Sequence, residues 1–100
     1  MITVTETAND QIEISRSEAN LPDLPLRIEI QVQKDGSFHY IMGFDDNIDV
    51  GDSKVEGSNI IYNEASKPLI EGMTLDFVEL DGKNQFIFLN PNDPNYRAPV

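Results

Sequence analysis

The clearest pattern in the chain is a strict alternation of apolar and polar residues over positions 26 to 33. Apolar residues alternate there with charged or amide residues, in the order Leu26, Arg27, Ile28, Glu29, Ile30, Gln31, Val32 and Gln33. A period of two is typical of a strand with one face buried and the other in water. Asp35-Gly36 then provides a turn, and residues 37–44 return with Phe38, Tyr40 and Met42 on one face. The segment is predicted to be an antiparallel β-hairpin.

A second hairpin is predicted near the C-terminus. Met73–Leu80 and Asn84–Leu89 are rich in Leu, Phe, Val and Ile, and Asp81-Gly82 lies between them. Asp-Gly between two such runs is a strong signal for a tight turn that joins antiparallel strands.

The N-terminal part is predicted to form a short strand and then a helix. Ile2–Thr5 favours the strand, and Thr7 with Asp10 resembles a capping box. The helix is expected to place Ala8, Ile12 and Ala19 on its apolar face. Leu21–Pro25 contains two prolines and is expected to end it.

The middle of the chain is predicted to hold a loop and a broken strand. Asp45–Ser53 is acidic and polar, so it is expected to lie at the surface. Val55–Tyr62 has the composition of a strand, interrupted near Gly57-Ser58.

A short helical turn is expected next, around Leu69 and Ile70. Either Asn63 or Ser66 is able to cap it, and Gly72 is expected to end it. The predicted elements together make a mainly β domain of the α+β class.

The composition indicates one cytoplasmic domain. One hundred residues with 39% hydrophobic content suit a single core. Residues 1–92 are assigned to this domain, and residues 93–100, with few apolar side chains, to a flexible tail. The first ten residues do not resemble a signal peptide, and no run approaches the roughly 20 apolar residues of a membrane span.

Charge and cysteine content narrow the function further. The formal net charge is -11, which disfavours nucleic acid and anionic membranes and favours a basic protein partner. The chain contains no cysteine, so disulfides, thiolate ligands and thiol nucleophiles are excluded.

Several motifs resemble those of the A-type iron-sulfur carrier family, which includes HesB, IscA and SufA. Leu75-Asp-Phe-Val78 and Phe86-Ile-Phe-Leu-Asn90-Pro91-Asn92 resemble its late signature. The likeness spans residues 2–92 and includes Ile2-Thr-Val-Thr5 with Ala8, Leu26-Arg27, Ser66 and Gly72. It implies a HesB-like compact β-sandwich of mixed strands with one longer and one short helix.

The family's three cysteine ligands are missing. In the register of the resemblance they fall on Asp35, Arg97 and Pro99. Because thiolates, and occasionally imidazoles, hold iron-sulfur clusters, this set is unsuited to one. The resemblance therefore implies a non-enzymatic accessory or regulatory protein with no cofactor. Cysteine-less relatives that occur beside genes of the reverse dissimilatory sulfite reductase type suggest sulfur oxidation as its setting.

Carboxylate-based binding of iron or calcium is the alternative. Five oxygen-bearing residues have the ligand spacing of an EF-hand loop, namely Asp45, Asn47, Asp49, Ser53 and Glu56. Gly51 lies one place beyond the position that requires glycine, and strands rather than helices flank the segment. An ordinary acidic loop is the preferred interpretation.

The remaining candidate residues provide no clear metal site or catalytic group. His39 with Asp35, Asp45 and Asp46 is conceivable as an iron site, but a lone strand histidine is more commonly a surface or packing residue. No serine has a nucleophile motif, so no catalytic residue is assigned.

The aromatic residues divide into two groups. Five strand aromatics are expected to share the core: Phe38, Tyr40, Phe77, Phe86 and Phe88. Tyr96 and Arg97 in the tail are the candidates for a partner contact. A monomer is expected, because the cluster that would bridge two copies has no ligands.

Overall fold

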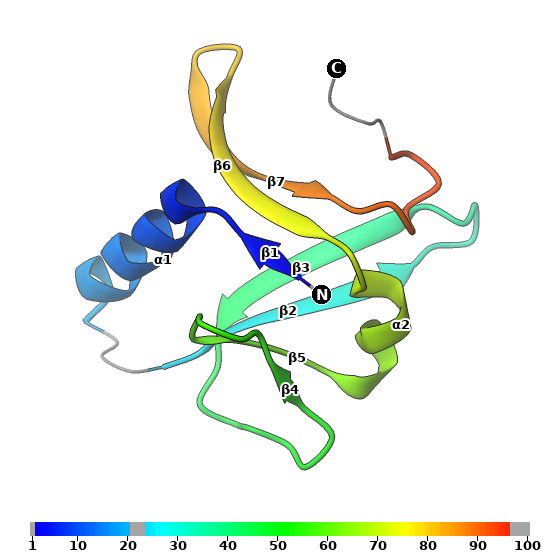
Figure 1. Cartoon of the computed structure of the whole chain (residues 1–100), viewed down its shortest axis with the longest axis horizontal. Helices are drawn as coiled ribbons and strands as arrows, with labels where there is room; N and C mark the ends of the chain where they lie inside the picture. Colours follow the sequence, from blue (N-terminus) through cyan, green and yellow to red (C-terminus); the bar gives the residue numbers. More distant parts are fainter. Residues whose placement is uncertain (1, 21–23, 97–100) are drawn as a thin grey trace.

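Two β-sheets pack against two α-helices in the part of the chain that the computed structural model describes, residues 2–20 and 24–96 (Figure 1). In chain order the elements are β1 (Thr3–Val4), α1 (Glu6–Glu18), β2 (Leu26–Val32), β3 (Phe38–Phe44), β4 (Ser53–Lys54), β5 (Ile60–Tyr62), the 3-10 turn η1 (Glu64–Ser66), α2 (Lys67–Ile70), β6 (Thr74–Leu80) and β7 (Lys83–Leu89). Neither helix is long and apolar enough to cross a membrane.

The sheets contain both parallel and antiparallel pairs. The larger sheet has the strand order β3-β2-β5-β4, and the smaller has the order β1-β6-β7. β2 runs antiparallel to β3 and parallel to β5, while β1 runs parallel to β6. The predicted fold class, with mixed strands, one longer helix and one short helix, is confirmed.

Both predicted hairpins are present. In the first, Leu26 pairs with Phe44 and Val32 with Phe38. In the second, Thr74 pairs with Leu89 and Leu80 with Lys83. Asp81 and Gly82 have φ angles of 53° and 79°, the left-handed geometry that a two-residue hairpin turn requires.

The helix α1 begins two residues earlier than predicted. Its N-cap is Thr5, whose Oγ1 accepts a hydrogen bond from the N–H of Ala8 at 3.1 Å. The Thr5 hydroxyl also donates to Asp76 Oδ1 of β6 at 2.7 Å, so the cap ties the helix to the smaller sheet. The capping box at Thr7 and Asp10 is therefore wrong, because Thr7 already lies inside the first turn.

The buried face of α1 also differs at its C-terminal end. Ala8 and Ile12 are buried as predicted, but the third buried residue is Arg16, and Ala19 is exposed. Arg16 Nε donates to the carbonyl of Leu24 at 2.8 Å, and its guanidinium lies 5.3 Å from the ring centre of Phe44. These contacts explain how a cation is accommodated on the inner face.

The predicted break at Gly57-Ser58 is present and joins two short strands. Val55 follows β4, and its N–H donates to the carbonyl of Ile60 at 2.9 Å, so β4 and β5 run antiparallel. Asn63 is the side chain that caps the turn, since its Oδ1 accepts from the N–H of Ser66 at 3.2 Å. Ser66 makes no side-chain cap.

The core lies between the two sheets. Its fully buried large side chains include Ile28, Ile60, Ile70, Met73 and Leu75. The five strand aromatics pack against this cluster as predicted, and Tyr40 stacks on Phe88 with ring centres 4.3 Å apart.

Candidate functional site

The tip of the first hairpin holds Asp35, the residue on which the resemblance is expected to place the first family ligand. One oxygen of its carboxylate, Oδ1, accepts from the N–H of Ser37 at 2.9 Å and from the Ser37 hydroxyl at 2.6 Å. These two bonds, the hydroxyl first, lower the pKa of the exposed Asp35 carboxyl. The side chain therefore shapes its own turn.

Arg27 of β2 organises the acidic loop at residues 45–52. Its Nε donates to Asp45 Oδ2 at 2.6 Å, and its two terminal nitrogens donate to both oxygens of Asp52 at 2.9 and 2.6 Å. Nη2 also reaches the carbonyl of Asn47 at 2.8 Å. The guanidinium thus joins the start, middle and end of the loop; this four-bond arrangement is called the Arg27 clamp below.

Two of the side chains in the Arg27 clamp are well shielded from water. The side chains of Arg27 and Asp52 are only 11% and 2% exposed, whereas that of Asp45 is 29% exposed. The hydrogen bonds from Arg27 and from the N–H of Asp49 lower the pKa of Asp52 to about 2. The N–H of Asn47, and then Arg27, lower the pKa of Asp45, while the two carboxylates raise the pKa of Arg27.

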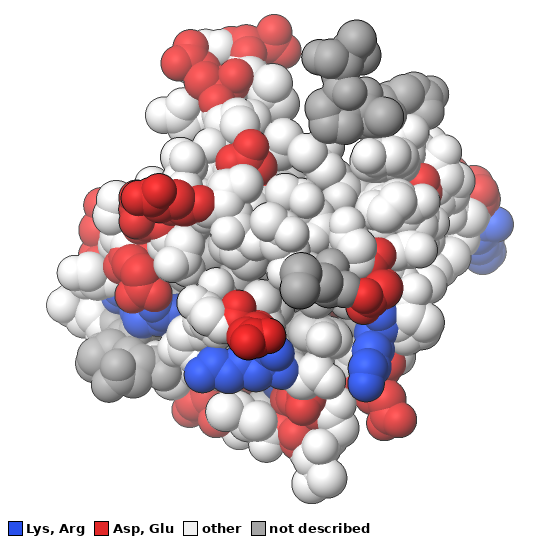
Figure 2. Space-filling view, in the orientation of Figure 1, with Lys and Arg blue, Asp and Glu red and all other residues white. Residues whose placement is uncertain are grey.

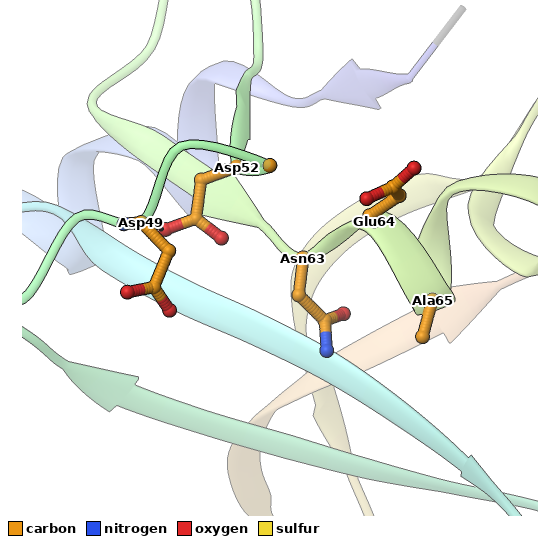
Figure 3. A pocket seen from close by; sticks show the side chains of 6 residues that line it. Asp49, Asp52, Asn63, Glu64 and Ala65 are labelled. Atoms are coloured by element: carbon orange, nitrogen blue, oxygen red, sulfur yellow. Dashed lines mark hydrogen bonds between the residues drawn. The ribbon is translucent and has the colours of Figure 1, made fainter.

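A hollow of about 500 Å³ opens beside the clamp (Figure 3). Asp49 and Asp52 border it from the acidic loop, and Asn63 and Glu64 border it from the segment that follows β5. Asp52 is already bound to Arg27 and to the N–H of Asp49, and Asn63 is committed to its helix cap. Two of the four polar side chains at this rim, those of Asp52 and Asn63, are thus already engaged within the protein.

The proposed EF-hand residues are not gathered around one point. Asp45 is bonded to Arg27 at the start of the loop, whereas Glu56 lies beyond β4 in the turn before β5. Within residues 2–20 and 24–96, no three His, Asp or Glu side chains come together as they would around a metal ion. The carboxylate site stays a prediction from spacing alone.

His39 and Asp35 lie on different parts of the first hairpin. His39 is an exposed residue within β3 and pairs with Gln31, whereas Asp35 belongs to the turn and bonds to Ser37. Asp45 and Asp46 follow the opposite end of β3. The structure therefore does not assemble the conceivable carboxylate-histidine site.

The segment after β7 is held against the domain by polar side chains. The fully buried Asn90 donates from Nδ2 to the carbonyl of Leu69 at 2.8 Å. Asp93 accepts the phenol proton of Tyr40 at 2.7 Å, and burial together with this bond raises the pKa of Tyr40. Asp93, the first residue of the predicted tail, is thus in contact with β3.

The predicted partner residues are only partly visible. Tyr96 is half-buried, and its N–H donates to the carbonyl of Asp93 at 2.9 Å. Arg97 and Pro99, on which the resemblance is expected to place the other two family ligands, lie outside the described residues. The contact at Tyr96 and Arg97 stays a prediction, as does the boundary between domain and tail.

Charge is distributed unevenly over the face seen in Figure 2. Acidic side chains gather over the tip of the β6–β7 hairpin and over α1, and the basic side chains in view lie in the lower half and at the right, with acidic groups beside them. The central part, over β1 and β6, carries few charged groups.

The role of Arg27 is the main feature that the sequence pattern missed. The alternation placed Arg27 correctly on the outer face of β2, but it gave no reason to connect it with a loop 18 to 25 residues later. The only available signal was one cation in a strand together with a nearby run of acids. Register and loop path decide such a pairing, and neither follows from periodicity.

Similar proteins and structures are known. The chain is 35% identical to the uncharacterized protein y4vC of Sinorhizobium fredii over 94 residues, which cover 92% of this chain and 89% of that protein. It is 33% identical over 91 residues to the iron-sulfur cluster insertion protein ErpA of Erwinia tasmaniensis, covering 88% of this chain and 79% of ErpA. No family model matches the sequence.

Among solved structures, the fold is similar to that of IscA crystallised with a [2Fe-2S] cluster. The TM-score is 0.74 at 22% identity, and the match covers 91% of this chain and 86% of that IscA chain. At this level of identity the likeness concerns the fold.

Proposed function

We propose that this chain, which belongs to the A-type iron-sulfur carrier (HesB/IscA) family, is a non-enzymatic accessory or regulatory protein that binds neither iron nor an iron-sulfur cluster. The observation that carries the proposal is the lack of any cysteine in a chain with this fold. Cluster iron is bound by thiolates, with imidazole as an occasional substitute, and the single histidine, His39, lies exposed on β3.

The environments of the carboxylates support the same proposal. Iron held by oxygen ligands needs several free carboxylates around one point. Asp35 is bonded to Ser37, and Asp45 and Asp52 are bonded to Arg27. Replacing these contacts with a cation would leave the shielded guanidinium of Arg27 unpaired, which is costly.

The protein then acts through contact with another protein. Its net charge of -11 favours a basic partner and opposes binding to nucleic acid or anionic lipid. We further propose that it is a cytoplasmic monomer. Its proposed setting is sulfur oxidation, and this part of the proposal rests on the resemblance to cysteine-less family members. The genes that adjoin its own gene test this setting, and neighbours unrelated to sulfur metabolism count against it.

Iron and sulfide reconstitution tests the cluster-free role directly. The purified chain is incubated anaerobically with ferrous iron and sulfide and desalted, and its absorption spectrum and its iron and sulfide contents are measured. The expected result is no visible charge-transfer band and no iron retained at a stoichiometric level. Stable retention of one iron or more per chain would overturn the proposal.

A pair of matched variants tests the alternative function, carboxylate-based binding of calcium or iron. If calcium or iron binds through the EF-hand-like spacing, Asp49→Asn together with Glu56→Gln should abolish stoichiometric binding. Glu79→Gln in the exposed end of β6 removes an acid far from that spacing and is the control. Calorimetry with calcium is expected to show no saturable binding to any of the three proteins.

A further inference from the structure

The outer edge of β3 is an unpaired strand edge, and we propose that its Met42–Phe44 segment binds an extended segment of a basic partner protein as an added strand. The sheet order β3-β2-β5-β4 leaves β3 with a neighbour on one side only (Figure 1). The inference rests on the proposed role as an interaction protein, for which it names the surface and the chemistry of the partner.

β3 differs from the other edge strands of the described sheets in having no protection against pairing. β1 and β4 are two residues long, and β7 begins with Lys83 followed by two polar residues. β3 has seven residues, Phe38–Phe44, with no proline, acid, lysine or arginine. Proteins usually protect edges by shortness, charge or proline. A long uncharged edge in so acidic a chain is thus suited to a partner strand.

The hydrogen-bond register shows which groups face outward. The N–H of Gln33 bonds to the carbonyl of Ser37, and the N–H of Asp45 bonds to the carbonyl of Pro25. Antiparallel pairs alternate between bonded and non-bonded, so Ile41 and Gly43 direct their backbone groups toward β2. Met42 and Phe44 therefore direct theirs to the open edge, where no described group bonds to their N–H.

Two hollows flank this edge, one on each face of the sheet. The inner hollow, about 260 Å³, is bordered by apolar side chains of α1, β3 and β7 that include Ile12, Phe44 and Phe86. The outer hollow, about 220 Å³, is bordered by Glu29, Gly43 and Asp45. Successive side chains of an added strand point to opposite faces, so apolar and polar residues in alternation would enter the two hollows in turn.

The net negative charge around the outer hollow favours a cationic side chain on the added strand. One guanidinium, that of Arg27, is paired with two carboxylates, so the clamp retains one net negative charge. Glu29 adds a second on the same face of the sheet. A lysine of the incoming strand fits this position.

A second copy of this chain is a poorer occupant than a foreign strand. Two copies would bring together two chains of net charge -11, and their β3 strands carry no lysine or arginine. The repulsion opposes edge-to-edge pairing at moderate ionic strength. The partner segment that fits this edge is therefore a basic one with alternating apolar and cationic residues.

Amide hydrogen exchange followed by NMR tests the proposal on the full chain. The probe is a peptide of alternating lysine and valine, about six residues long, the usual length of a strand. Saturation with it is expected to slow exchange at Met42 and Phe44 by about tenfold or more, because a bonded amide must open to exchange. Exchange at Ile41 and Gly43, already bonded to β2, is expected to stay unchanged.

A peptide with the same composition but its lysines and valines in two blocks is the control, and it should give little protection. Equal protection by both peptides, or none by either, would overturn the proposal. If protection of the Met42 and Phe44 amides grows with protein concentration in the absence of peptide, and light scattering shows a dimer, the strand bound at this edge is that of a second copy and the proposal is wrong. Iron retention is measured without peptide, so failure here is distinguishable from failure of the cluster-free role.

Two variants locate the binding edge. Met42→Pro removes an outward N–H while sparing the bonds to β2, as proline is tolerated at strand edges. Gly43→Val fills the outer hollow, and a Cβ at Gly43 meets no atom within 4 Å, so the fold is retained. Each variant should weaken the binding of the alternating peptide by about tenfold, which corresponds to about 1.4 kcal/mol of binding free energy. Unchanged affinity in a folded Gly43→Val protein would contradict the proposed edge.

Discussion

At the scale of single residues, the hydroxyl of Ser66 continues the hydrogen bonding of β2 beyond the end of β5. The N–H of Leu26 donates to the carbonyl of Asn59 at 3.0 Å, and β5 ends at Tyr62. The N–H of Ile30 has no strand partner there and donates instead to Ser66 Oγ at 3.0 Å. Ser66 is completely buried, so no water can substitute for it.

Ser66→Ala should therefore destabilise the protein by about 1–3 kcal/mol, the cost of leaving a buried donor unpaired. Urea denaturation followed by circular dichroism measures the change. Ser17→Ala, on the exposed side of α1, is the matched control and should lie within about 0.5 kcal/mol of the unmodified chain. Equal stability of the two variants would show that the Ser66 bond contributes nothing.

At the scale of elements, the Arg27 clamp holds an eight-residue acidic loop that contains almost no secondary structure. The loop exposes Ile48 and Val50, of which Val50 is fully exposed, so apolar burial does not fix its path. Four bonds from one guanidinium tie the loop to β2, in addition to hydrogen bonds within the loop itself.

Arg27→Gln should release the acidic loop while both sheets stay intact. The expected result is faster amide exchange at Asn47 and Asp49, whose N–H groups donate to Asp45 and Asp52, by about tenfold or more. Lys34→Gln removes a cation from an exposed turn and is the control for the loss of one charge. Unchanged exchange in Arg27→Gln would mean that the loop is held by other contacts.

Acid should weaken the same element. Asp52 has a pKa of about 2 in the fold against an ordinary value of 3.8, and the pKa of Asp45 is also lowered. A depressed folded pKa gives stability that is complete above the unfolded value and is lost as pH falls through the folded one. The clamp's contribution should therefore disappear between about pH 4 and pH 2.

Melting temperatures of the unmodified chain and Arg27→Gln, compared across that range, measure the effect. The difference between the two proteins should be largest near neutral pH and shrink toward about pH 2, because both then lack the ionised partner. A difference that is constant with pH would contradict the role of the paired carboxylates.

At the scale of the whole molecule, the surplus of acidic groups opposes the compact state. A net charge of -11 on 100 residues creates repulsion that the Arg27 clamp relieves at one place only. Raising the ionic strength from about 0.01 M to about 0.15 M shortens the Debye length to about 8 Å and should raise the melting temperature by a few degrees. Thermal scans in sodium chloride measure this, and a fall in melting temperature would show that attractive surface pairs dominate.

The sequence determined the elements whose signals are local. The alternation over Leu26–Val32 and the two Asp-Gly turns predicted both hairpins, because strand period and turn geometry depend on neighbouring residues alone. The missing thiolates were equally plain, because a ligand type that is absent from the chain cannot be created by folding.

Only the tertiary structure decided the contacts between distant segments. Thr5 rather than Thr7 caps α1 because Asp76 of β6 lies beside it, 71 residues away. Arg27 meets the acidic loop, and β3 rather than β2 is the open edge, because the chain order of strands does not fix their order in a sheet. Composition and periodicity report what each segment can bury, whereas partners across the fold depend on how the buried faces pack together.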